Sequence, residues 1–300
     1  MSSDERTTVG EALERESVER DEEVAQPGDG LEDEEPRPLG AEAPEIVHDA
    51  ALIGGRRLRR PAFESAVTGF IGGLSVCFGA VAMAWASTAA GENAELGHLL
   101  GALAFPVGFI ILLVGKSELF TENFFLPVTA VLEREGSLRE LARLWSSTLV
   151  FNLVGVGVFA LLITRPEVLD AGPAAMLVDL AEKKVGYSLS TALIKAIFAG
   201  WLMTLLTWLL IAAEGFSSKL LLIWIMGSLI VLGEFNHVVI SAAEIWIGIL
   251  LDADVSAPEW FLRNFLPALA GNLIGGVVFV TLLHYVQALT HVRAAEEEDG

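Results

Sequence analysis

Six long apolar segments dominate the 300 residues of this chain and limit what it can fold into. They lie at about residues 66–89, 99–131, 145–164, 190–213, 218–251 and 264–288. An apolar helix of ~20 residues crosses the ~30 Å hydrocarbon core of a bilayer, and all six segments reach that length. In lipid each segment must satisfy its own backbone hydrogen bonds, as a helix does. The sequence therefore predicts an all-α membrane protein with six transmembrane helices.

The formal net charge of −20 is concentrated near the N-terminus. Residues 1–49 contain 17 acidic residues, four arginines and no aromatic residue. Such a stretch buries too little apolar surface to offset the entropy that ordering would cost. We therefore expect a disordered acidic tail over residues 1–55, a membrane domain over residues 56–290 and an acidic C-terminal tail over residues 291–300.

Basic residues in the connections predict the orientation in the membrane. The stretch "RRLRR" (residues 56–60) precedes the first segment, and Arg134, Arg139 and Arg143 follow the second. Short connections rich in lysine and arginine stay in the cytoplasm. Because six crossings return the chain to its starting side, we expect a multi-pass protein of the cell membrane with both termini in the cytoplasm.

The second and fifth segments are longer than one straight span needs, and each contains a polar interruption. These interruptions are "GKSELFTEN" (residues 115–123) and "GEFNH" (residues 233–237). The segments that follow them contain the similar stretches "FNLVGVGVF" (residues 151–159) and "GNLIGGVVF" (residues 271–279). This pattern indicates an inverted repeat of three helices, with helices 2 and 5 interrupted. Broken helices at matching positions of two halves point to a transport site near the midplane.

Several charged side chains lie in or beside these interruptions. A charged side chain at the bilayer centre costs ~3 kcal/mol, so each of them must face protein or water. As a structural alternative, the lysine could simply pair with a nearby glutamate and hold two helices together. His237 likewise either faces a pore or donates a hydrogen bond to a buried backbone carbonyl. The charged residues are Lys116, Glu118, Glu122, Glu234 and Glu244.

The sequence lacks the common signatures of enzymes. It contains no phosphate-binding loop, no zinc-ligand pattern and no serine–histidine–acid set at a membrane surface. We therefore expect no enzymatic activity, no catalytic residue, no metal or cofactor and no nucleic-acid partner.

Four motifs resemble those of the formate/nitrite transporter family. "ELFTEN" (residues 118–123) resembles the omega-loop motif that interrupts the second helix, and "FNH" (residues 235–237) resembles the Phe–Glu–His motif of the fifth. "GNLIGG" (residues 271–276) is similar to the sixth helix, and residues 183–205 are similar to the approach to the fourth helix and its body. The resemblance implies an aquaporin-like fold in the lipid bilayer, a homopentamer and one pore per protomer.

The resemblance also implies roles for individual residues. His237 matches the central pore histidine, and Thr121 matches the omega-loop threonine that hydrogen-bonds near it. Asn272 matches an asparagine that lines the pore, and Lys184 matches a lysine of the outer vestibule. The two hydrophobic constrictions of the family fall on Phe105, Phe109, Leu119, Phe120, Met203 and Ile230.

Three departures from the family pattern concern the pore. Asn236 replaces the glutamate of the Phe–Glu–His motif, while Glu234 supplies an acid two positions earlier. Gly200 replaces an asparagine of the fourth helix. Glu122 stands where characterised members carry a small residue, and Glu244 adds another acid downstream. Asn236, Glu234 and Glu122 therefore join the candidate pore residues.

These residues favour transport of a small monovalent weak-acid anion such as formate or nitrite. Moving a charge through an apolar constriction is costly, and neutralising it removes most of that cost. Lys184 would attract the anion, and a proton from His237 or from water would let the neutral acid pass. Because carboxylates in a pore attract cations, a channel for neutral solutes or ammonium-like cations is one alternative. A non-conducting membrane scaffold that uses its acidic tail is the other.

Overall fold

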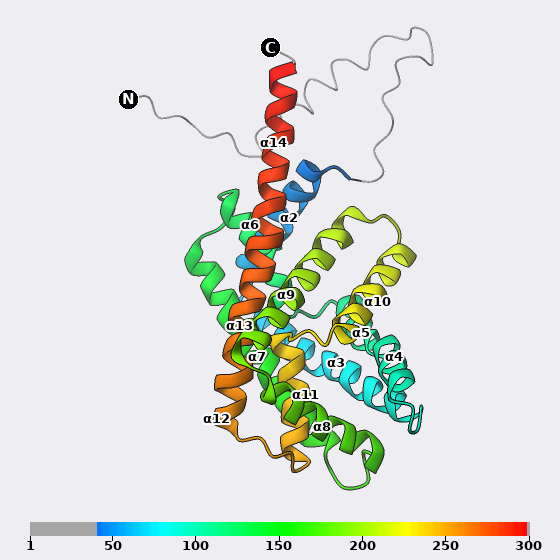
Figure 1. Cartoon of the computed structure of the whole chain (residues 1–300). Helices are drawn as coiled ribbons and strands as arrows, with labels where there is room; N and C mark the ends of the chain where they lie inside the picture. The colour runs from blue at the N-terminus through cyan, green and yellow to red at the C-terminus, as the bar shows by residue number, and fades with distance from the viewer. Residues whose placement is uncertain (1–40, 299–300) are drawn as a thin grey trace.

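The computed structural model describes residues 41–298, and these residues form helices and loops without a strand (Figure 1). The first half contains α2 (Ala43–Leu58), α3 (Ala62–Thr88), α4 (Ala94–Ala104), α5 (Pro106–Val114), the 3-10 helix η1 (Phe120–Phe124), α6 (Leu126–Leu132) and α7 (Leu138–Ile163). The second half contains α8 (Ala171–Gly186), α9 (Leu189–Ala212), α10 (Phe216–Leu232), α11 (Val238–Leu250) and one long final helix. That final helix comprises α12 (Ala257–Glu259), the π-helical η2 (Trp260–Phe265), α13 (Leu266–Leu273), the π-helical η3 (Ile274–Leu282) and α14 (Leu283–Glu298).

The six predicted transmembrane helices are confirmed, including the two interruptions. Helices α3, α7 and α9 and the final helix each form one long apolar span. The second span runs through α4 and α5, breaks at residues 115–119 and resumes in η1 and α6. The fifth consists of two shorter apolar helices, α10 and α11, with a break at residues 233–237.

The inverted repeat is present, and it includes one helix more in each half than the sequence indicated. Helix α2 precedes the first span, and α8 precedes the fourth. The two lie at opposite ends of the molecule, α2 beside α6 and α14, and α8 beside α11 and η2 (Figure 1). Each half therefore consists of a short helix, a span, a broken span and a further span.

An asparagine from α7 fastens the first break. The Asn152 side chain donates hydrogen bonds to the carbonyl oxygens of Gly69 on α3 (2.7 Å) and Glu118 in the break (2.9 Å). Its own oxygen accepts from the N–H of Phe120 at 2.8 Å. One buried amide thus satisfies the Glu118 carbonyl and the Phe120 N–H, which the interrupted helix leaves without intrahelical partners, and joins them to α3.

An asparagine from α13 fastens the second break in the same way. The Asn272 side chain donates to the carbonyl oxygens of Ala196 on α9 (2.8 Å) and Asn236 in the break (3.0 Å). Its oxygen accepts from the N–H of Val238 at 2.8 Å. The sequence resemblance between the third and sixth spans therefore has a physical cause, because each span must carry this amide at the same height.

Glycines on the first and fourth spans allow these asparagine-bearing helices to approach. A Cβ on Gly73 would lie 2.1 Å from the carbonyl oxygen of Asn152, and one on Gly200 would lie 2.2 Å from that of Asn272. Real Cβ atoms do not come so close, so both positions require glycine. Gly200, which departs from the family pattern, is here a packing requirement.

Two boundaries expected from the sequence are wrong. Residues 43–55, assigned to the disordered tail, belong to α2, which begins with a Glu42–Glu45 capping box and a proline. Ile46, Val47 and Ala50 of α2 are buried against the α6 and α9 helices. This short apolar stripe was obscured by the surrounding acidic residues. Residues 291–298 continue α14 and form no separate tail, and the expectation of disorder for residues 1–40 lies outside the described residues.

Candidate pore and its vestibules

His237 lies at the second break, where it caps α11. Its Nδ1 accepts a hydrogen bond from the N–H of Ile240 at 3.3 Å, and its Nε2 lies 2.7 Å from the Thr121 hydroxyl of η1. Both side chains are fully buried. Because a backbone N–H can only donate, Nδ1 must be unprotonated, and Nε2 carries the hydrogen of a neutral imidazole. The two breaks thus bring together the histidine and threonine that the sequence singled out.

Asn236, next to His237, lies in a buried network of amides and hydroxyls. Its side-chain oxygen accepts from the hydroxyl of Ser241 (2.6 Å) and from the amide of Asn264 (3.1 Å). Asn264 on η2 is fully buried, and the sequence analysis missed it. Its only signal is an amide next to an arginine at the start of the sixth span.

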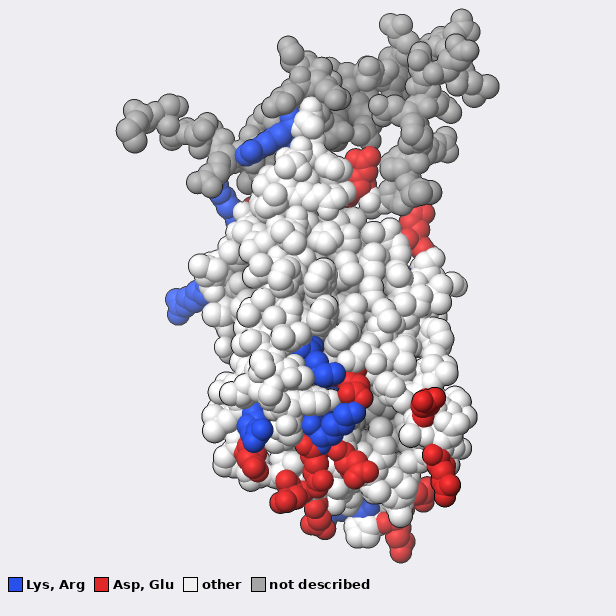
Figure 2. Space-filling model, viewed as in Figure 1, with Lys and Arg blue, Asp and Glu red and all other residues white. Residues whose placement is uncertain are grey.

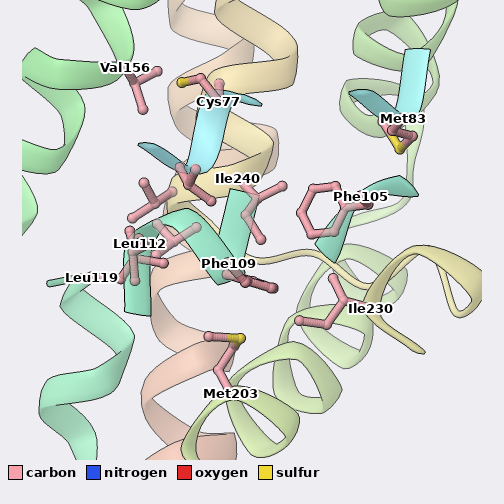
Figure 3. Packing of buried hydrophobic residues seen from close by; sticks show 14 of the residues in the cluster. Cys77, Met83, Phe105, Phe109, Leu112, Leu119, Val156, Met203, Ile230 and Ile240 are labelled. Carbon is pink, nitrogen blue, oxygen red and sulfur yellow. The ribbon is translucent and has the colours of Figure 1, made fainter. Parts of the chain in front are cut away.

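The six constriction residues are all buried in one apolar cluster. Figure 3 shows Phe105, Phe109, Leu119, Met203 and Ile230 in one closely packed region between the broken spans. The Phe105 and Phe109 rings meet edge to face at 5.4 Å. Phe120 instead packs against Phe124 (4.8 Å) and Trp145 (6.1 Å) on the side of α7. All six positions are therefore apolar and shielded from water.

A cavity of about 630 Å³ opens on one side of this cluster, and we call it the outer vestibule. Its lining includes Lys184 of α8 and Glu244 of α11, which form a buried ion pair. Lys184 Nζ also lies 3.3 Å from the Ser241 hydroxyl. Ile230 and Ile240 line the cavity as well, so the vestibule reaches the constriction.

A second charged cluster lies at the wall of the outer vestibule. Glu234, in the left-handed backbone region at φ 50°, accepts from Lys183 Nζ (2.5 Å) and the Tyr187 hydroxyl (2.9 Å), and Lys195 Nζ is 3.7 Å away. Figure 2 shows that basic and acidic side chains gather on the lower part of the molecule, on the side that faces the viewer. Burial, and then the hydrogen bond to Glu234, raise the pKa of Tyr187 well above its ordinary value. Glu234 therefore belongs to the vestibule wall and makes these bonds away from His237.

The acids in and just after the first break pair with Arg57 of α2 and with Arg60, which lies between α2 and α3. Arg57 Nε lies 3.3 Å from Glu118, its Nη1 lies 3.8 Å from Glu122, and it donates to the Asn123 amide oxygen at 3.1 Å. Arg60 also pairs with Glu118. The expected alternative partner of these acids, Lys116, has an exposed side chain. Glu122 thus points toward α2, and we call this cluster the inner ion-pair site.

Arg57 is the functional candidate that the sequence analysis missed. It ends α2 just before the first span, as Lys184 lies near the end of α8 just before the fourth. Each cation pairs with a carboxylate beside the second half of a broken span. The signal was present in "RRLRR", but there the arginines were interpreted only as determinants of orientation.

Comparison with known proteins identifies the chain. The family model described as "Formate/nitrite transporter" matches residues 44–286. This chain belongs to the formate/nitrite transporter family. The "Uncharacterized transporter YrhG" of Bacillus subtilis (strain 168) is 31% identical over 260 residues, which are 85% of this chain and 96% of that protein. The "Probable formate transporter" of Methanothermobacter thermautotrophicus is 31% identical over 246 residues, 76% of this chain and 89% of that protein.

A solved structure shares the fold of the chain described here. The "Pentameric formate channel with formate bound" superimposes with a TM-score of 0.67 at 21% sequence identity. The superposition covers 76% of this chain and 98% of that one. The match confirms the arrangement of six spans with broken second and fifth helices.

In this member of the formate/nitrite transporter family, Asn236 replaces the glutamate of the Phe–Glu–His motif. The motif of this chain therefore contains no carboxylate. Glu244, two helical turns later on α11, supplies the buried carboxylate that pairs with Lys184. Ser241 lies between them and bonds to both Asn236 and Lys184. This chain thus carries a buried carboxylate on α11, eight positions after Asn236.

Proposed function

We propose that this protein conducts a small monovalent weak-acid anion, such as formate or nitrite, across the cell membrane. The observation that carries the proposal is the path from the Lys184 vestibule through buried phenylalanines to the paired His237 and Thr121. The family and its formate-transporting relatives support the same substrate class. Proton-coupled or neutral-acid permeation follows from the apolar constriction, which a bare charge crosses at high cost.

Each part of the path has a task in this proposal. Lys184 in the outer vestibule and Arg57 at the inner ion-pair site bind the anion at the two ends of the path, each in place of a paired carboxylate. The apolar constriction admits the permeant as a neutral acid. His237 offers its Nε2–H as a hydrogen-bond donor in the middle of the pore, held in this tautomer by the cap on α11. Asn272 keeps the second break, and therefore His237, in position.

The assembly we propose is a homopentamer with one pore in each protomer and both termini in the cytoplasm. The pentameric solved relative supports the number of subunits. Many large apolar side chains cover the lateral surface, as contact with lipid and with other copies requires. The arginines at residues 56–60 support the orientation. Native mass measurement of a monomer or trimer would contradict the pentamer.

Flux measurements on purified protein in liposomes test the proposed function. Formate and ammonium uptake are compared at about pH 5 and about pH 8, the interval in which a weak acid or a histidine changes charge. We expect formate uptake that is faster at the acidic pH and no ammonium uptake. Ammonium uptake without formate uptake would contradict the proposal.

The carboxylates in the path keep a cation or neutral-solute channel as a second candidate, because acids near a pore attract cations. In the structure, however, Glu118, Glu122, Glu234 and Glu244 each lie within ion-pair distance of a lysine or arginine. Paired acids attract cations weakly, so their presence does not by itself favour a cation channel. The third candidate, a scaffold acting through its tail, predicts that deleting residues 1–40 abolishes function, whereas a channel keeps its flux.

A further inference from the structure

We propose that Glu244 is the proton acceptor of the outer vestibule, taking up one proton as Lys184 binds one anion. This inference rests on the proposed function and assigns the coupling proton to a particular side chain. The anion and the proton would then enter as a pair, and neither would need to bind alone.

The geometry leaves Lys184 no other charged partner. Its side chain is 6% exposed and that of Glu244 is 3% exposed, and the two are in direct contact. Ser241 provides the only further hydrogen bond to Nζ found among the described residues. Lys184 should attract the permeant anion, but its positive charge is therefore already neutralised by a carboxylate of the protein.

Competition between the two carboxylates creates the coupling. If an anion bound Lys184 while Glu244 stayed ionised, two buried negative charges would share one positive charge. A buried charge without its partner is strongly destabilising. A proton on Glu244 removes the excess charge and frees the ammonium for the anion. Binding of anion and proton is then mutually favourable, as thermodynamic linkage requires.

The other groups around Glu244 are poor acceptors for this proton. Asp179 and Lys183 of α8, Glu234 and the exposed His98 of α4 line the same cavity. Glu234 is held by Lys183 and Tyr187, and His98 Nε2 lies 3.1 Å from the Val231 carbonyl oxygen. Among the described residues only Glu244 is paired with Lys184, so an anion bound to Lys184 competes with Glu244 alone. Cys77 of α3 is buried, and as a thiol it carries no charge to lose. Helix α13 has no titratable residue, those of α7 lie in its first two turns, and Arg263 of η2 is exposed.

His237 is also unsuited to accept the proton while the second break keeps its structure. Its Nδ1 accepts the Ile240 N–H, and its Nε2 faces Thr121. A proton on Nδ1 would break the cap of α11 and charge a fully buried ring. Glu244 can be protonated without loss of a backbone hydrogen bond.

The proposed step balances in atoms and charge. A proton from external water forms an O–H bond on Glu244 while the anion takes its place on Lys184. As the permeant moves inward, that O–H bond breaks and an O–H bond forms on the permeant. The neutral acid enters the constriction, and the Lys184–Glu244 ion pair forms again. The inner ion-pair site, where Arg57 meets Glu118 and Glu122, can receive the proton and release the anion by the reverse sequence.

Proton uptake on formate binding tests this assignment. Purified protein is titrated with formate in weakly buffered solution near neutral pH, and the protons taken up are counted with an indicator. We expect one proton per formate for the wild type and for Glu92→Gln, an exposed outer-loop acid that serves as the control. Glu244→Gln should bind formate without proton uptake. Its formate affinity should change less than about twofold over a pH unit, against roughly tenfold for the wild type.

A second measurement needs no variant and so does not depend on the folding of Glu244→Gln. In the wild type, infrared difference spectra with isotope-labelled formate should show a protein carboxylic-acid band on formate addition. Absence of that band, or one proton still taken up per formate by Glu244→Gln, would overturn the assignment to Glu244. Formate transport that persists in those cases leaves the proposed function intact, whereas a wild type that neither binds nor transports formate overturns both.

Discussion

At the first break the residues are Lys116, Glu118 and Leu119, and at the second the matching positions hold Glu234, Asn236 and His237. The two backbones are nevertheless alike. Lys116 and Glu234 both adopt left-handed conformations, at φ 59° and 50°, and both breaks are fastened by an asparagine from the span that follows. The two halves thus share the support of the break, whereas only the second half carries a histidine there.

The comparison of the two halves also includes two cations, one in the outer vestibule and one at the inner ion-pair site. Lys184 and Arg57 come from the matching helices α8 and α2, and each meets buried carboxylates. The carboxylates come from different places, from α11 on one side and from the break and η1 on the other. The position of the cation is thus shared between the halves, whereas the position of its counter-ion is not.

The largest expected effect concerns the two fasteners. Asn152→Leu and Asn272→Leu each remove three hydrogen bonds to buried backbone groups. Two of the three groups lie in or beside the break and have no helical partner, so at roughly 1–3 kcal/mol per unpaired buried group each variant should lose about 2–6 kcal/mol of stability. Thermal unfolding in detergent measures the loss, and Asn93→Ala, an exposed helix cap, is the control with a loss near 1 kcal/mol. A large loss of stability in only one of the two variants would show that the two asparagines are not equivalent.

The glycine contacts should give the next largest effect. Gly73→Ala and Gly200→Ala each place a methyl group against an asparagine carbonyl and should cost about 1–3 kcal/mol through overpacking. Gly186→Ala is the matched control, since no atom lies within 4 Å of its Cβ position. Melting temperatures of the three variants would sharpen the comparison, and an unchanged Gly200→Ala would contradict the close approach of α9 and α13.

Removing the vestibule cations tests whether the halves share function. Lys184→Met and Arg57→Met should each lower initial formate flux by about tenfold, because each loses the cation that binds the anion, a contact worth roughly 1.5–3 kcal/mol. Stopped-flow uptake in liposomes measures this, with Arg139→Met, an exposed arginine at the start of α7, as the control. Loss of flux in Lys184→Met alone would show that the inner ion-pair site is only structural.

The variant His237→Phe distinguishes two roles for the histidine, a hydrogen-bond donor in the pore and a proton relay. The variant loses the Nε2–H donor and the cap on α11, so flux should fall and stability should drop by about 1 kcal/mol. The pH dependence of the remaining flux should persist, because the imidazole is neutral in this account. Flux measured at about pH 5 and about pH 8, together with a melting curve, distinguishes these two roles. Flux that no longer depends on pH would instead identify His237 as the relay.

The smallest effect is expected at the vestibule wall. Glu234→Gln weakens a partly exposed ion pair and should change stability by no more than about 1 kcal/mol. It should also bring the pKa of Tyr187 closer to its ordinary value, because a charged acceptor is lost. Ultraviolet titration in a Tyr285→Phe background measures this shift. An unchanged pKa would mean that burial alone raises it.

Helix lengths and breaks could be predicted because lipid imposes them on each segment separately. The apolar run sets the span, and the polar run within it sets the break. The His237–Thr121 contact depended on the family resemblance, since no local pattern joins residues 116 positions apart. The contacts of Arg57, Glu244 and Asn264 could not be derived from local patterns, because they arise where separate helices pack together. Helix α2 was hidden by its acidic surroundings, although Ile46, Val47 and Ala50 have the spacing of a buried face.

The most direct test of anion–proton transport measures both species in one preparation. Liposomes containing the protein and an internal pH dye receive an inward formate gradient, and labelled formate uptake and internal acidification are recorded together. The account predicts one proton entering per formate, at a rate that does not respond to an imposed membrane potential. Formate uptake that follows the potential without acidification would show that the bare anion crosses, and would contradict the account.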